Sequence, residues 1–205
     1  MQSNLATMLQ RAEEGKYAVI AFNYSDLWDL KGILRAAEEE RAPIMVAAVP
    51  AIVHNHGVKF IGGVARAAAE STAGPVVPQL DHSNSVALCM DVIDHELKSV
   101  MIDASHLPFK ENVTIVKPVV DYAHARGVHV EGELGRIKGA NWEGVFVDGT
   151  DYLTDVREAV EFIKQTGVDS LAVGIGSGHG FYNETPNLDI QRLSEIKAAT
   201  GAKLY

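Results

Sequence analysis

The sequence has 205 residues, of which 47% are apolar and 22% are charged, which is ordinary for a globular protein with one sizeable core. Its net charge of −9 argues against nucleic acid or an anionic membrane surface as the main partner. The single cysteine, Cys89, excludes an intramolecular disulfide and favours a reducing compartment. The N-terminus does not have the apolar core of a signal peptide, and the longest apolar stretch, 43–53, is far shorter than the ~20 residues that span a bilayer. We therefore expect a cytoplasmic protein.

Apolar runs typical of strands alternate with amphipathic segments typical of helices. A short helix is expected first, over 1–15, because Leu5, Met8 and Ala12 follow the helical period. Pro118 predicts a break or a kink in the helix that contains it. Strands are expected at 17–23, 43–49, 76–81, 99–105, 128–135, 170–176 and 202–205, and the helices between them at 27–40, 58–71, 85–97, 113–125, 155–165 and 190–199.

This alternation implies parallel strands joined by right-handed crossovers, in either an open doubly wound sheet or a barrel. No expected strand is followed by a glycine-rich dinucleotide fingerprint with an acidic residue ~20 positions on, which disfavours the open sheet. The spacing of the strands matches a (β/α)8 TIM barrel, which takes ~250 residues for eight units. We therefore expect 1–205 to form a single α/β barrel domain that lacks the end of strand seven and all of unit eight.

Polar residues collect at the carboxyl ends of the expected strands, where a (β/α) barrel carries its catalytic groups. Any one of them could be a cap or loop residue, but five strands with polar ends indicate a site. His82 and His179 lie on different strands, and neutral imidazole is a common zinc ligand. The strand-end residues are Asn23, Asp81, His82, Asp103, Ser105, His106, Glu131, Glu133 and the segment 176–180.

The carboxylates and glycines at these ends allow more than one interpretation. Glu131 and Glu133 are two apart on a strand and so point to the same side, either toward a metal or into bonds within the barrel core. The glycine-rich segment 176–180 leaves backbone N–H groups available to an oxyanion and predicts a phosphate cradle. His54 and His56, by contrast, are interpreted as residues of a solvated loop.

Five segments resemble the class II, zinc-dependent ketose-bisphosphate aldolases, most closely the tagatose- and fructose-1,6-bisphosphate aldolases. The segments are AFN (21–23), LDH (80–82), SVMIDASHLPF (99–109), VEGELG (130–135) and DSLAVGIGSGHGFY (169–182), in order along nearly the whole chain. The resemblance implies a TIM-barrel aldehyde-lyase of carbohydrate metabolism. Such an enzyme cleaves a ketose (bis)phosphate to dihydroxyacetone phosphate and an aldehyde through a zinc-stabilised enediolate. Its homologues are commonly dimers or tetramers, so the resemblance implies a homo-oligomer.

The resemblance also implies roles for individual residues. His82 and His179 match zinc ligands, and Asp81 matches the acid/base that acts on the C4 hydroxyl of the sugar. Glu133 and Asp103 match carboxylates near the zinc or near a second or monovalent cation. The positions that match substrate or phosphate contacts are Asn23, Gly176, Ser177 and Gly180.

The sequence departs from the family in two places. The third zinc histidine and the eighth-strand segment would follow Tyr205, so we interpret the chain as part of a longer protein or as a naturally shortened relative. An incomplete barrel is expected to expose apolar surface and to associate. In addition, the loop 136–153 has Asn141 where relatives have a proton-donating glutamate. Because an amide is not a general acid, Glu143 becomes the candidate donor, and a different ketose phosphate becomes possible as substrate.

One alternative function follows from these departures, and a second alternative is another class of aldolase. A truncated paralogue, non-catalytic or weakly active and with a binding role, would explain both the missing ligand and the altered loop. A Schiff-base aldolase would need a lysine at the carboxyl end of a strand, and Lys98, Lys138 and Lys203 lie elsewhere.

Overall fold

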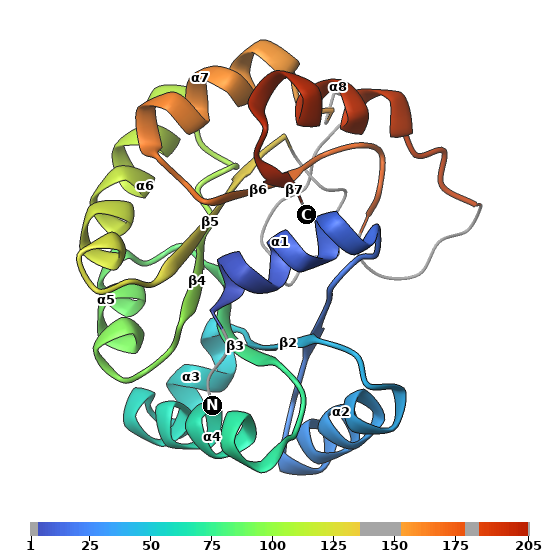
Figure 1. Ribbon diagram of the computed structural model, residues 1–205. Coiled ribbons are helices and arrows are strands. Elements are labelled where there is room, and N and C mark those ends of the chain that lie inside the picture. The colour runs from blue at the N-terminus through green and yellow to red at the C-terminus, as the bar shows by residue number, and fades with distance from the viewer. Residues whose placement is uncertain (1–3, 136–152, 179–184, 205) are drawn as a thin grey trace. The chain divides into compact units, whose positions relative to one another are not determined.

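The computed structural model describes residues 4–135, 153–178 and 185–204 (Figure 1). These residues belong to two compact units, each built from two separate segments of the chain. The first unit contains Met1–Ile102 and Asp121–Val130, and the second contains Asp103–Val120 and Glu131–Tyr205. In both units the strands alternate with helices, as the sequence predicts.

The strands of the first unit are β1 (Ile20–Asn23), β2 (Ile44–Ala48), β3 (Val76–Ser83) and β4 (Ser99–Ile102), side by side in chain order. Each pair is parallel, with Ile20 level with Ile44 and Ile44 level with Val76. Strands β2 and β4 are buried along their whole length, but β1 is an edge strand with exposed side chains. Ile20 and Phe22 are 56% and 47% exposed, which agrees with the expected exposed apolar surface.

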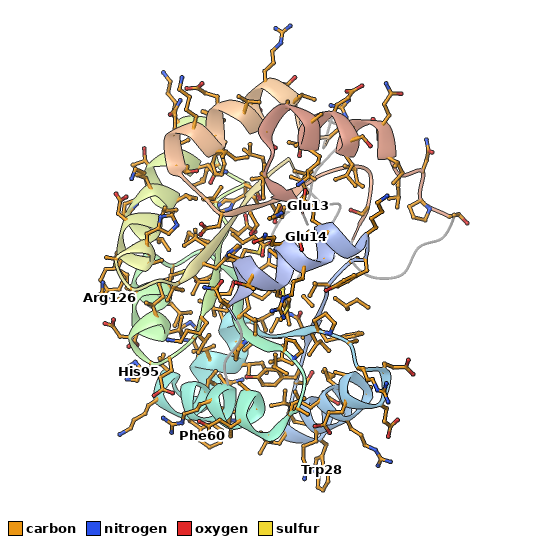
Figure 2. The ribbon with its side chains drawn as sticks, in the orientation of Figure 1. Glu13, Glu14, Trp28, Phe60, His95 and Arg126 are labelled. Atoms are coloured by element: carbon orange, nitrogen blue, oxygen red, sulfur yellow. The ribbon has the colours of Figure 1, made fainter. Side chains whose placement is uncertain are left out.

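Helices fill the connections that parallel pairing requires. Helix α1 (Leu5–Gly15) precedes β1, and the connecting helices are α2 (Leu27–Glu40), α3 (Pro50–His56), α4 (Val58–Ser71) and α5 (Val86–Asp94). Asn4, Asp26 and Ser85 cap the starts of α1, α2 and α5 by accepting hydrogen bonds from backbone N–H groups of the first turn. Figure 2 shows Trp28 of α2 and Phe60 of α4 projecting outward, and both are exposed.

The second unit holds β6 (Ser170–Val173), β7 (Lys203–Leu204), α7 (Val156–Thr166) and α8 (Ile190–Thr200). Strand β5 (His129–Leu134) begins in the first unit and ends in the second. Helix α6 (Phe109–His124) begins in the second unit and ends in the first. Strands β5, β6 and β7 are parallel neighbours, with Glu133 level with Ala172. The fully buried Phe162 of α7 packs edge-on against Phe109 of α6, with ring centroids 6.1 Å apart.

One local prediction was wrong, and of the break or kink predicted at Pro118 the break does not occur. His54 and His56 are solvent-exposed, as expected, but they lie on α3 rather than in a loop, because Pro50 occupies its first turn, where proline favours a helix start. Helix α6 continues through Pro118 without a break. Val116, Val119 and Val120 are almost completely buried around that proline, and their packing offsets the lost backbone hydrogen bond. No helix within the described ranges is long and apolar enough to cross a membrane.

Candidate active site

A bulge places Asp81 and His82 at the carboxyl end of β3. Leu80 pairs with Val100 and Ser83 pairs with Ile102, so β3 has one more residue than β4 between these two pairs. His82 has a φ of 46°, in the left-handed region that non-glycine residues rarely adopt. Bulges redirect side chains and are frequent beside active sites. The predicted strand end at Asp81 is therefore wrong, because β3 continues through Asp81 and His82 to Ser83.

The side chains of Asn23 and Asp81 meet in the first unit. The Asn23 amide donates a hydrogen bond from Nδ2 to Oδ2 of Asp81 at 2.9 Å. Asn23 is the last residue of β1, and the next residue, Tyr24, still donates its backbone N–H to Ala47 of β2. The contact fixes the orientation of the Asp81 carboxylate, a role for Asn23 that its strand-end position alone did not reveal.

Glu131 and Glu133 in the second unit are 4% and 3% exposed. The glycine between them shows which way they point. A Cβ at Gly132 would lie only 2.9 Å from the ring of Phe162 and 3.1 Å from Val168, so this position faces helix α7. Because alternate residues of a strand face opposite sides, both glutamates face the side of the sheet away from α7, as the sequence predicts.

Ser105 connects two carboxylates of the second unit. Its backbone N–H donates to Oδ1 of Asp103 at 2.9 Å, and its hydroxyl donates to Oε1 of Glu133 at 3.3 Å. The end of β5 is held as well, because Nδ2 of the buried Asn112 donates to the backbone carbonyl of Glu133 at 3.0 Å. Carboxylates oriented by hydrogen bonds are suitable oxygen ligands for a cation.

A buried threonine ties the ends of β5 and β6 together. The Thr154 hydroxyl donates to the carbonyl of Leu134 and accepts from the N–H of Gly174. Thr154 and the two donors Ser105 and Asn112 all line a cavity of about 450 Å³ in the second unit. From the sequence Ser105 is only a strand-end residue, and Asn112 and Thr154 give no signal at all, because a polar residue near a helix start carries no sign of a distant partner.

Gly176 is required by the backbone of the segment after β6. Its φ is +103°, and a Cβ would lie 2.7 Å from the carbonyl oxygen of Asn187. The same two segments are joined by the Asp189 N–H, which donates to the carbonyl of Ile175 at 2.8 Å. Ser177, the next residue, is half-buried. The other predicted residues His179, Gly180 and Glu143 lie outside the described residues.

Comparisons with known proteins identify the family. The sequence profile of the family "Fructose-bisphosphate aldolase class-II" matches residues 3–204. The chain therefore belongs to the class II fructose-bisphosphate aldolase family, as the motifs predicted. Family and fold together support an aldolase function, and class II aldolases are generally metal-dependent.

Solved structures of aldolases share the fold. The YdjI aldolase from Escherichia coli K12 is 30% identical, with a TM-score of 0.86 over 100% of this chain and 72% of its own. A protein assigned as a fructose-1,6-bisphosphate aldolase from Coccidioides immitis is also 30% identical, with a TM-score of 0.89 over 98% of this chain and 71% of its own. The Campylobacter jejuni fructose-bisphosphate aldolase, at 18% identity, covers 96% of this chain and 63% of its own with a TM-score of 0.78, and shows the fold alone. These similarities confirm the predicted aldolase TIM-barrel fold, matched over about seven-tenths of the two proteins at 30% identity.

Proposed function

We propose that the chain is a metal-dependent class II aldolase that cleaves a ketose (bis)phosphate to dihydroxyacetone phosphate and an aldehyde. Membership of the family over residues 3–204 supports the reaction class. The observation that carries the proposal for this chain is the end of β3, where a bulge presents Asp81 and His82 side by side and Asn23 orients the Asp81 carboxylate. A purely structural strand end would need none of these three features.

We propose His82 and His179 as zinc ligands, with Glu133 and Asp103 as oxygen donors to the zinc or to a second or monovalent cation. Imidazole nitrogen and carboxylate oxygen are the ligands that zinc prefers in catalytic sites. The hydrogen bonds from Ser105 to Asp103 and Glu133 suit this role, since ligating carboxylates are usually held in this way. A bound zinc ion would supply Lewis-acid stabilisation for the negative charge that develops on the ketone oxygen.

Asp81 is the proposed general base. As the C3–C4 bond breaks, the C4 hydroxyl becomes an aldehyde carbonyl and must lose its proton, which the Asp81 carboxylate accepts. The amide of Asn23 holds that carboxylate in one orientation through the 2.9 Å hydrogen bond. Glu143 is the proposed residue for the second proton transfer, at the substrate carbon. Asn23, Gly176, Ser177 and Gly180 are proposed contacts of the sugar phosphate.

The proposal extends to partners and location. The negative net charge of the chain disfavours nucleic acid, so a phosphorylated sugar bound by local backbone donors is the proposed partner. Ser177 and the glycines around it would provide those donors without adding a positive charge. We further propose that the protein forms a homo-oligomer and acts in the cytoplasm.

The decisive experiment combines metal analysis with an activity assay. Purified protein should contain about one zinc ion per chain and should release dihydroxyacetone phosphate from at least one of a panel of ketose mono- and bisphosphates. Chelation should abolish turnover, and added zinc should restore it. Protein that binds a sugar phosphate without cleaving it would instead be the binding paralogue, and substrate trapped on a lysine by borohydride would indicate a Schiff-base aldolase.

A matched pair of substitutions tests the proton transfer. Asp81→Asn keeps an oxygen that can accept from Asn23 but cannot take a proton. It should retain zinc while lowering kcat by roughly 10²–10⁴-fold, the usual contribution of a positioned acid or base. The exposed Asp29→Asn should leave kcat unchanged. Full activity of Asp81→Asn would refute the assignment.

A further inference from the structure

Ser105, in the second unit, contacts both proposed oxygen donors. It lies in the turn after β4, where the Leu107 N–H donates to the carbonyl of Ala104 at 3.0 Å. Within this turn the backbone N–H of Ser105 donates to Oδ1 of Asp103, two residues earlier. Its hydroxyl reaches Oε1 of Glu133, which is 28 residues further along the chain. The two contacts join the end of β4 to the end of β5.

The direction of both hydrogen bonds follows from the chemistry of the groups. An ionised carboxylate can only accept hydrogen bonds, so the backbone N–H and the hydroxyl of Ser105 must donate. The backbone donor is present whatever residue occupies position 105. The hydroxyl is specific to serine or threonine, so the orientation of Glu133 depends on the side chain of Ser105, and that of Asp103 depends on the turn.

The backbone of Glu133 is held independently of its side chain. Asn112 is 1% exposed and donates to the Glu133 carbonyl at 3.0 Å. Strand pairing with β6 also holds this residue, because Glu133 is level with Ala172. Loss of the Ser105 hydroxyl would therefore leave the strand in place and change only the freedom of the Glu133 carboxylate.

We propose that Ser105 is a positioning residue that orients Glu133, together with Asp103, for binding one divalent cation. This inference rests on the proposed function, in which Glu133 is an oxygen donor to the metal. Hydrogen-bond partners of metal ligands typically contribute 10–100-fold to metal affinity. Ser105 acts through one carboxylate oxygen of Glu133, so the contribution is expected near the lower end of this range.

The test measures Co²⁺ and Zn²⁺ binding to the full chain and to five variants. Ser105→Ala removes the hydroxyl and keeps the turn, whereas Ser105→Thr keeps a hydroxyl at the same atom. Ser194→Ala is the matched control, because it removes an exposed serine hydroxyl that donates to Ile190 within α8 of the same unit. Glu133→Ala removes the acceptor, and this variant alone and combined with Ser105→Ala completes a double-mutant cycle. Co²⁺ is titrated by its visible absorption, and Zn²⁺ by competition with a chromophoric chelator.

Ser105→Ala should weaken binding of both ions about 10-fold and change the visible spectrum of bound Co²⁺. Ser105→Thr should restore affinity to within about 3-fold of the parent, and Ser194→Ala should match the parent. In the Glu133→Ala background, which has no acceptor for the Ser105 hydroxyl, Ser105→Ala should cause little further loss, because the residue acts through Glu133. A general loss of structure would not be rescued by threonine and would not vanish in that background.

The inference is overturned if Ser105→Ala binds Co²⁺ with the affinity and spectrum of the parent, or if Ser105→Ala has the same effect in the Glu133→Ala background as in the parent. Either result would leave the proposed function intact, since the parent would still bind metal. If the parent itself bound neither ion, the metal-dependent function would be refuted. The parent titration therefore distinguishes the two failures.

Discussion

Asn23 donates a hydrogen bond to Asp81 although the two residues are 58 positions apart and lie on strands that do not pair with each other. Strand β2 separates them, and its Ala47 is level with both Asn23 and Gln79, two residues before Asp81. The bulge at the end of β3 redirects the chain here, and the Asp81 carboxylate meets the end of β1. The orientation of the proposed base is thus set by a residue of another strand.

Asn23→Ala should lower kcat by about 10–100-fold, because a catalytic group that loses its orientation reacts less often in the productive geometry. Zinc content should be unchanged, since Asn23 touches Asp81 and not a proposed zinc ligand in the first unit. Steady-state kinetics and metal analysis of the purified variant provide the measurement. The exposed Asn55→Ala on α3 serves as control and should behave as the parent. Parental kcat in Asn23→Ala would show that the hydrogen bond does not orient the base.

His82 has a left-handed backbone, so a substitution at this residue should affect stability and function differently. Of the non-glycine residues with positive φ in the described ranges, Lys16 and Arg41 terminate helices and Glu96 follows the end of α5, whereas His82 lies inside a strand. A left-handed conformation costs about 1–2 kcal/mol for a residue with a Cβ. Strain of this kind tends to persist at functional sites.

His82→Gly should therefore keep the free energy of unfolding within about 1 kcal/mol of the parent, because relief of strain offsets the lost side-chain contacts. Zinc content and activity should both be lost. Urea unfolding and metal analysis of the same sample test the two statements separately. Arg41→Gly, at a helix end with φ 53°, should gain stability and keep zinc. Retained zinc in His82→Gly would remove His82 from the ligand set.

Two glycine substitutions should change stability in opposite directions. Gly176→Ala should destabilise the fold by roughly 1–3 kcal/mol, because alanine is strained at φ +103° and its Cβ would clash with the Asn187 carbonyl. Gly63→Ala, in the middle of α4, meets nothing within 4 Å and should stabilise by roughly 0.5–1 kcal/mol. Chemical denaturation of both variants gives the comparison. A stable Gly176→Ala would mean that the segment adopts another conformation.

Much of the scaffold was predictable because its signals are local. Helices α2 and α4 begin and end at the predicted residues, since each has a clear apolar period and α2 begins after the cap Asp26. The prediction that Asp81 and His82 are site residues rested on their position at the end of an apolar run, and the structure places both at the end of β3.

The connections between distant residues were not predictable in the same way. Nothing at Asn23 or Ser105 indicates its partner, because each hydrogen bond depends on the register and curvature of strands far away in the chain. The bulge at His82 was missed because a histidine does not by itself indicate a left-handed residue: histidine adopts positive φ more often than most residues, but still rarely. Such features depend on tertiary structure rather than on local sequence.

Cys89 should make stability fall at alkaline pH. Its side chain is fully buried against the strands, and burial raises the thiol pKa from 9.0 to about 11, despite an opposing hydrogen bond with Ser83. Between pH 9 and 11 the unfolded chain therefore loses a proton that the folded chain keeps, so the stabilising contribution is complete below pH 9 and disappears as the pH rises toward 11. The shift corresponds to a loss of about 2 kcal/mol by pH 10.5.

Urea unfolding of the parent and of Cys89→Ala from pH 8 to pH 10.5 isolates the contribution of the thiol to stability. Buried Tyr24, with a pKa raised to about 12, titrates equally in both proteins. The parent curve should descend more steeply than that of Cys89→Ala, and parallel curves would show that the thiol is accessible to water in the folded protein.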